Sequence, residues 1–326
     1  MKRFALLLLA AALLLSFSAC GGGAASDPKV NFGVLKGPTG VGAAPFLRDH
    51  ASGYNITLAS DPTNLTALLI NGELDIACLP TNVAATLYNK TDGGVRMLAL
   101  ITKSMLYILE NGGRIQSMGD LRGRTLYATG QGANPEYVLD YLLTQNGLTP
   151  GQDVQIVWED SDTLSAQAAS GDVDLAMLPV PAATSVTLKN PDMRYALDLG
   201  AEWDKMDNGS GMYMSCVVVR TAFLQSRIQE TQRFLEDFSA SLDSMINFAS
   251  GAQQPAFDVG QLLADLQIVG SADVGNAALP YAGLCDLKGA EMRVAVSGYY
   301  QVLFDADPSS IGGAVPGDDF YSDLNL

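Results

Sequence analysis

Apolar and polar positions alternate along this chain in short blocks that predict strands and helices in turn. Residues 54–60 (YNITLAS) alternate like a half-buried strand, and apolar residues at helical spacing follow in 65–71 (LTALLIN). Gly72 is a typical helix end, after which 73–79 (ELDIACL) reads as a short apolar strand and 83–89 (VAATLYN) as a second helix. This alternation predicts an α/β fold with mainly parallel sheets and helices on both faces.

The same block occurs a second time further along the chain. Residues 56–86 align without a gap on 155–185, at an offset of 99, with nine identical positions. The identities include the Asp before the first helix, the Gly that ends it, and the Leu-Pro pair that closes the following strand. Two copies are too few for a solenoid. They predict two similar α/β lobes with a cleft between them.

Upstream of each copy, a strand leads through a Gly-rich turn into a helix. The turns are 36–42 (KGPTGVG), after the strand 30–35, and 129–134 (TGQGAN), after 124–128. Such turns direct free N–H groups and the positive end of the helix dipole toward whatever occupies the cleft. Neither turn has the G-x-G-x-x-G spacing of a dinucleotide site. The same device in both lobes therefore indicates contact with a ligand.

The division into lobes is expected where an Asn-Gly-Gly turn breaks an apolar run at 111–113. Lobe 1 would comprise residues 29–109 and 214–326, and lobe 2 residues 110–213. The segment 213–220 (YMSCVVVR) would carry the chain back, and the two crossing segments would form a hinge. The tail after it reads as helical and is expected to pack on lobe 1, with Tyr299 and Tyr300 in the core or at its rim.

The N-terminus has the features of an export signal. Lys2 and Arg3 precede an apolar run, 4–15, which is too short to span a bilayer as an anchor. The sequence LSFSAC then resembles the bacterial lipoprotein signal, in which Cys20 receives a diacylglycerol thioether and further acylation such as palmitate. Residues 1–20 are therefore expected to be the signal and lipid site, and the Gly-rich 21–28 a flexible tether. The expected location is the extracytoplasmic face of the bacterial membrane.

Charge and titratable residues limit the function classes. Of 19 Lys and Arg residues, two lie in the signal, so 17 remain against 35 Asp and Glu, a formal charge near −18. That field repels nucleic acid and anionic membrane surfaces. The one histidine, His50, lies in a polar turn and supports neither a metal centre nor a catalytic triad. Cys78, Cys216 and Cys285 match no disulfide framework, although one pair could bridge. No cofactor and no metal are expected.

Five strings together resemble a known family. They are LKGPTG, NGELDIACLPTNVA, GDLRGRTLYATGQGANPEYVLDYLL, SGDVDLAMLPVPAAT and SIGGAVPGDDFY. The chain resembles the substrate-binding lipoproteins of ATP-driven (ABC) importers in the nitrate/sulfonate/taurine class, which includes binders of thiamine precursors. The resemblance implies a type II periplasmic-binding-protein fold that closes over one small molecule and delivers it to a membrane permease. The protein would be a monomer and would have no catalytic residue.

The resemblance also implies which loops hold the ligand. Hydroxyls of Thr39 and Thr81, amides of Asn82 and Asn134, and backbone N–H groups would be the donors, with Lys36 as the one cation. Relatives often carry a glutamate where this chain has Val180, which leaves the pocket more apolar. The implied ligand residues are Lys36, Pro38, Thr39, Gly40, Pro80, Thr81, Asn82, Gly130, Gln131, Gly132, Ala133, Asn134, Asp160, Ser161, Val180 and Pro181.

Several alternatives stay open at this point. An enzyme on the same fold, similar to menaquinone- or pyrimidine-pathway enzymes, is the first. The acid pairs Glu73/Asp75 and Asp172/Asp174 could be offered for catalysis, but they are better interpreted as solvated turn and edge residues. A lipoprotein that presents ligand to a sensor is the second. The ligand is either a small organic anion or a flat heterocyclic metabolite stacked on an aromatic ring near the cleft, such as Tyr107, Trp158 or Tyr213.

Overall fold

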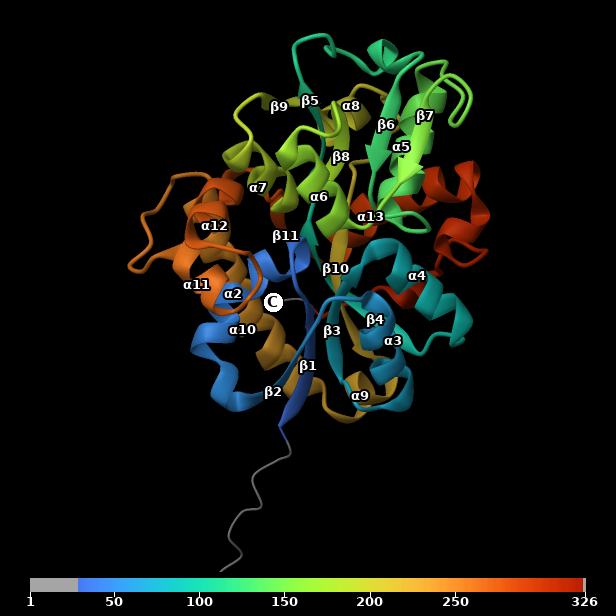
Figure 1. Ribbon diagram of the computed structural model, residues 1–326. Helices are drawn as coiled ribbons and strands as arrows, with labels where there is room; N and C mark the ends of the chain where they lie inside the picture. The colour runs from blue at the N-terminus through green and yellow to red at the C-terminus, as the bar shows by residue number, and fades with distance from the viewer. Residues whose placement is uncertain (1–28, 325–326) are drawn as a thin grey trace, which may run out of the picture.

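The structure, a computed structural model, describes residues 29–324. The expected signal, the lipidated Cys20 and the tether lie outside the described residues. The described chain forms two sheets, one above the other in Figure 1, with helices around each. Among the described residues, no helix is both long enough and apolar enough to cross a membrane.

The larger sheet has six strands in the order β11-β4-β10-β3-β1-β2, and the smaller has five in the order β7-β6-β8-β5-β9. The larger sheet consists of β1 (Val30–Leu35), β2 (Tyr54–Ala59), β3 (Ile76–Pro80), β4 (Val95–Thr102), β10 (Ser215–Arg220) and β11 (Leu284–Lys288). The smaller sheet consists of β5 (Leu106–Asn111), β6 (Thr125–Ala128), β7 (Gln155–Trp158), β8 (Leu175–Pro179) and β9 (Met193–Asp198).

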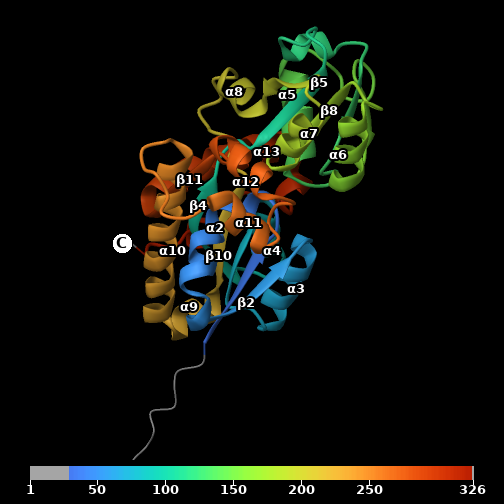
Figure 2. The same cartoon turned by 60° about the vertical axis from the view of Figure 1, so that its left-hand side comes forward.

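Helices alternate with the strands through both halves. Those of the first half and the tail are α2 (Pro38–Asp49), α3 (Pro62–Asn71), α4 (Thr81–Lys90), α9 (Thr221–Ser226), α10 (Ile228–Ala249), α11 (Val259–Asp265), α12 (Ala272–Ala278) and α13 (Gly289–Ala306). Those of the smaller half are α5 (Asn134–Gln145), α6 (Ser161–Ser170), α7 (Ala182–Lys189) and α8 (Leu199–Asp204). The long helix α10 lies along α2 (Figure 2).

The sheets are mixed, so the expectation of mainly parallel sheets is wrong. Pairs β1–β2, β1–β3, β6–β7 and β6–β8 are parallel, whereas β10 is antiparallel to both neighbours, as is β5. The reason is the path of the chain. β5 and β10 each enter their sheet from the other half, so each starts at the edge where the parallel strands end.

The internal repeat is present in the geometry. α3 and α6 span residues exactly equivalent at the offset of 99, and so do β3 and β8. Gly72 and Gly171 end α3 and α6 in the left-handed conformation, with φ of 79° and 82°. Only glycine adopts that conformation without strain, which explains why both copies keep it.

The chain passes between the sheets twice, through 103–105 after β4 and through 205–214 before β10. The division expected after Leu109 falls inside β5, because that whole strand pairs with β8 and β9. In the tail, α10 packs on the larger half as expected, while α13 contacts β4, β11 and also α5 of the smaller half. Tyr299 and Tyr300 of α13 are fully buried.

Candidate ligand-binding site

Four helices begin where parallel strands end, at the edges of the two sheets that face each other. α2 follows β1 and α4 follows β3 in the larger half, and α5 follows β6 and α7 follows β8 in the smaller half. In none of these four helices does the N-cap residue make a side-chain capping hydrogen bond, whereas Asp61 caps α3 and Asp160 caps α6. Uncapped first turns present backbone N–H groups and the positive end of the helix dipole. The arrangement is suited to an electron-rich ligand.

Thr39 lies in the first turn of α2, since the helix begins at Pro38 inside the predicted loop. Its buried hydroxyl lies 3.4 Å from the Ser215 hydroxyl. Ser215 pairs with Pro80 on one side and with Thr102 on the other. The buried Thr102 Oγ1 has no hydrogen-bond partner among residues 29–324. Sequence reasoning missed Ser215 and Thr102, because only the register of β10 places Ser215 between Pro80 and Thr102.

Asn82, in the first turn of α4, is the clearest ligand candidate. The residue is 4% exposed, and its Oδ1 has no hydrogen-bond partner within the described part of the chain. A buried amide oxygen without a partner carries a desolvation cost of about 1–3 kcal/mol. A ligand that donates a hydrogen bond to this oxygen removes that cost. So does a ligand that accepts a hydrogen bond from the amide N–H group after the amide group has rotated by 180°.

Asn134, at the start of α5, differs from Asn82 because both polar atoms of its side chain are hydrogen-bonded. Its Nδ2 donates to Thr81 Oγ1 at 3.0 Å and to the Met214 carbonyl at 3.2 Å, and Tyr299 donates to its Oδ1 at 3.4 Å. Thr81 in turn donates to the Tyr213 carbonyl at 2.7 Å, and its own carbonyl accepts from Tyr300 at 2.8 Å. Both predicted residues are buried in this network, and both hydrogens of the Asn134 amide are used.

The backbone donors expected in the Gly-rich turns are already engaged. Gly40 N–H donates to the Gly37 carbonyl, Ala133 N–H to the Gly130 carbonyl, and Gly132 N–H to a Glu136 carboxylate oxygen. These three groups therefore stabilise their own turns. Gln131, between Gly130 and Gly132, is exposed. Gly40 has no room for a side chain, because a Cβ atom there would lie 2.7 Å from the Leu35 carbonyl oxygen.

Three other predicted ligand residues, Asp160, Ser161 and Lys36, are not buried. Asp160 is exposed and accepts from the N–H groups of Asp162 and Thr163, so it serves as a helix cap. Ser161 begins the same helix, and its carbonyl accepts from Ser165. Lys36 donates to Gln267 Oε1 at 3.3 Å on an exposed surface.

Val180 and Pro181 are buried where the two halves touch. Val180 donates its N–H to the Met105 carbonyl at 2.8 Å, and it packs in one apolar cluster with Ala278 of α12. The hairpin of α11 and α12, from the tail, thus contacts α7 of the smaller half and also α2 of the larger half. It forms one flank of the region in which the four helices begin.

The interior of this region is electrically neutral. The buried carboxylate side chains in the described chain include those of Asp75, Glu110, Glu202 and Asp286, and each has a basic partner: Arg220, Arg194, Lys205 and Lys288. The expectation that Asp75 is solvated is wrong, since it is 6% exposed and accepts from both the backbone and the side chain of Asn31. Burial raises the pKa of Tyr299 and Tyr300 far above the usual range, so both hydroxyls stay protonated donors.

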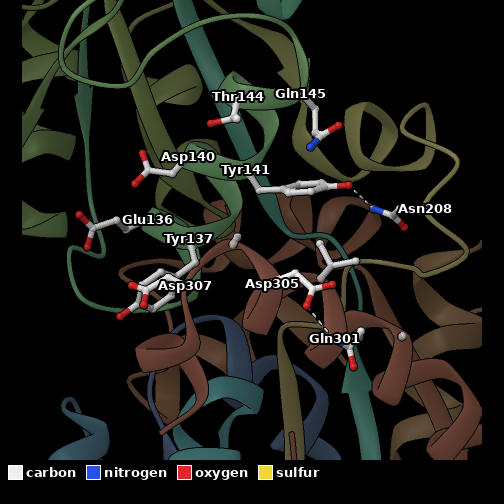
Figure 3. Close-up of a pocket in the computed structure, with 13 residues that line it drawn as sticks. Glu136, Tyr137, Asp140, Tyr141, Thr144, Gln145, Asn208, Gln301, Asp305 and Asp307 are labelled. Carbon is white, nitrogen blue, oxygen red and sulfur yellow. Dashed lines mark hydrogen bonds between the residues drawn. The ribbon is translucent and has the colours of Figure 1, made fainter. Parts of the chain in front are cut away.

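A cavity of about 930 Å³ lies elsewhere, between α5 and α13 (Figure 3). None of the predicted ligand residues lines it. Its charged lining consists of carboxylates, and burial, followed by repulsion from Glu136, raises the pKa of Asp140 to about 6. Within residues 29–324, no three His, Cys, Asp or Glu side chains are grouped to hold a metal ion. The carboxylates here are Glu136, Asp140, Asp305 and Asp307.

Two facing α/β lobes with helix N-termini between them define a substrate-binding protein of the periplasmic type, and the sequence comparison agrees. The family model described as "ABC transporter, phosphonate, periplasmic substrate-binding protein" matches residues 53–222, a little over half of the chain. The chain belongs to this family, and its function is that of the substrate-binding component of an ABC transporter. A search of curated proteins finds no significant match.

Solved structures share the fold at low sequence identity. An ABC transporter protein from Parabacteroides distasonis is 21% identical, with 92% of this chain and 100% of that chain covered and a TM-score of 0.74. The aliphatic sulphonate-binding protein SsuA of Escherichia coli is 19% identical over 92% and 95%, with a TM-score of 0.67. The alkanesulfonate-binding SsuA of Xanthomonas axonopodis pv. citri, bound to MOPS, is 14% identical over 90% and 96%, with a TM-score of 0.64. The type II periplasmic-binding-protein fold expected from the sequence is confirmed.

Proposed function

We propose that this protein captures a small organic oxyanion, such as a phosphonate or a sulfonate, between its two lobes and delivers it to an ABC permease. One observation carries the proposal: four uncapped helix N-termini meet around a neutral, hydroxyl-rich interior that includes the partnerless Asn82 amide. Helix N-termini bind anions without a full positive charge nearby. The family and the sulfonate-binding neighbours support the same ligand class.

The heterocycle alternative has less support, because the candidate aromatic rings are already occupied. Tyr107 packs edge-on against Tyr195, with ring centroids 5.0 Å apart, and also contacts Tyr281. Tyr213 is buried, and Trp158 packs against the apolar core from β7. The rings of Tyr107, Tyr213 and Trp158 therefore pack against the protein and are not free to stack on a ligand.

A thermal-shift screen tests the ligand class. The panel holds phosphonates, sulfonates, carboxylates and neutral heterocycles, and Asn82→Ala is the matched variant. A ligand at about 100 times its dissociation constant adds roughly 2.7 kcal/mol of stability, and we expect an oxyanion to raise Tm by about 5 °C. The Asn82→Ala variant should lose about half of this shift or more. A shift with heterocycles alone would contradict the proposal.

We also propose that Cys20 carries a lipid and that the protein acts as a monomer tethered to the outer face of the membrane. The signal-like N-terminus supports the anchor. Intact-mass spectrometry of detergent-extracted protein should show a diacylglycerol adduct, and Cys20→Ala should move the protein to the soluble fraction. An unmodified N-terminus downstream of Cys20 would refute the anchor.

Co-purification with a permease rather than a receptor would separate import from sensing, and a turnover assay with the bound ligand would reveal an enzyme.

A further inference from the structure

Asn134 joins the two lobes directly. It belongs to α5 of the smaller half, and its amide donates to Thr81 Oγ1 of α4 in the larger half and to the Met214 carbonyl in the second crossing segment. Since the Met214 carbonyl can only accept, the Asn134 amide must present its N–H group there, which fixes the orientation of the side chain. All atoms of the contact are buried.

Two tyrosines of helix α13 stabilise this contact. Tyr299 donates to Asn134 Oδ1, and the adjacent Tyr300 donates to the Thr81 carbonyl, so neighbouring residues of one helix hold both partners. Tyr299 also packs against Trp203 of α8, with ring centroids 5.3 Å apart. The helix therefore contacts both lobes at the place where Asn134 meets Thr81.

The side-chain amides of Asn82 and Asn134, each at the start of a helix, thus differ in whether they are already hydrogen-bonded. Asn82 lies one residue after Thr81 and has a buried oxygen without a partner in the described chain, whereas both amide hydrogens of Asn134 are already used. A ligand that accepts hydrogen bonds, as an oxyanion does, could bond the Asn134 amide group only by breaking a contact between the lobes. We infer that Asn134 does not contact the ligand and is a positioning residue, which holds the lobes at their binding distance through Thr81 and Met214.

This inference rests on the proposed two-lobe binding function, and it predicts how affinity depends on the contact. If the bound arrangement is only partly populated, the apparent dissociation constant rises by the inverse of its population, whatever the ligand. Loss of the two bonds from Asn134 should weaken every ligand of a panel by one common factor of about 5- to 30-fold. A residue that touches the ligand would instead change the order of preference among ligands.

The deciding measurement is the distance between the lobes without ligand. Asn64 and Thr163 occupy equivalent positions of the repeat, are exposed, and lie in the first turns of α3 and α6. Spin labels on Asn64→Cys and Thr163→Cys report the separation of the lobes by pulsed electron-spin resonance. In the chain without residues 1–20, the native thiols at Cys78, Cys216 and Cys285 are buried and should not react.

We expect Asn134→Ala to shift the distance distribution to longer values in the ligand-free chain, with Tyr299→Phe shifting it less. Thr81→Val should act like Asn134→Ala, and Thr81→Ser, which keeps the hydroxyl, should restore the original distribution. Asn82→Ala should leave the distribution unchanged. An unchanged distribution in Asn134→Ala, or in Tyr299→Phe and Thr81→Val if Asn134→Ala does not fold, overturns the inference. Because no ligand is present, this result is independent of whether the proposed ligand class is correct.

Discussion

Asp61 and Asp160 lie 99 residues apart and carry out the same task in the two lobes. Asp61 accepts from the N–H of Thr63 at the start of α3, and Asp160 accepts from Asp162 and Thr163 at the start of α6. Each carboxylate satisfies donors that the helix itself leaves unpaired. The shared cap explains why the aspartate recurs in both copies of the repeat without any need for a ligand at Asp160.

Removal of either cap should therefore affect stability and leave ligand binding intact. We expect Asp61→Ala to lower the free energy of unfolding by about 1 kcal/mol and Asp160→Ala to lower it as well. Urea unfolding measures this, and Asp192→Ala, at an exposed aspartate, should change stability by less than about 0.5 kcal/mol. If Asp160→Ala instead bound ligand with a larger dissociation constant and had unchanged stability, Asp160 would belong to the ligand site.

The buried pair of Asp75 and Arg220 should matter far more. Asp75 Oδ1 lies 3.1 Å from Arg220 Nη2, and Asp75 Oδ2 accepts from the backbone and the amide of Asn31. Substitution by alanine removes the acceptor of these partly buried donors, so Asp75→Ala should cost about 3 kcal/mol in urea unfolding. The exposed Asp174→Ala, at the equivalent position of the repeat, is the matched control and should be near neutral. Equal effects of the two substitutions would contradict this account.

The same pair shows what a sequence can and cannot predict here. The repeat, the helix caps and the glycine ends follow from local patterns, which explains why α3, α6, β3 and β8 fall where the sequence places them. Burial of Asp75 beside Arg220 depends on β10 lying next to β3, a contact between distant segments. Ser215 was missed for the same reason. Candidate ligand residues are recognisable by type, yet which amide is already bonded depends on packing across the lobes.

Asp140 should make stability depend on pH. Burial raises its pKa to about 6, with Glu136 as the second cause, and Asp305 and Asp307 line the same cavity. A folded-state pKa above the unfolded value means that the folded protein binds the proton more tightly, so stability falls as pH rises through about 4 to 6. Asp140→Asn should raise Tm by about 2 °C at pH 7, with no difference at pH 4. Thermal unfolding across this range checks it, and an equal gain at both values would exclude the carboxylate as the cause.

The three cysteines in the described chain should be unreactive until the protein unfolds. Cys78, Cys216 and Cys285 are free and buried, and burial raises the pKa of the Cys285 thiol to about 12 and that of Cys216 well above its usual value. Only the thiolate reacts quickly with a disulfide reagent. Titration with such a reagent should give almost no reaction in the native state and full reaction of all three in urea. A disulfide found by peptide mapping would contradict the free thiols.

Lys36 should contribute weakly to the binding of an anion, although it is the one cation among the predicted ligand residues. Its ammonium group donates to Gln267 Oε1 on an exposed surface, where solvent and salt screen its charge. We expect Lys36→Ala to weaken an oxyanion by only about 2- to 5-fold at low salt, with the difference vanishing at high salt. Asn82→Ala, which removes a buried amide at a helix start, should cost at least about tenfold at either salt concentration. Isothermal titration of both variants, with Gln267→Ala as the control for the Lys36 contact, separates the two contributions. A salt-independent loss of binding in Lys36→Ala would place its charge on the ligand and move the anion site toward the exposed end of α2.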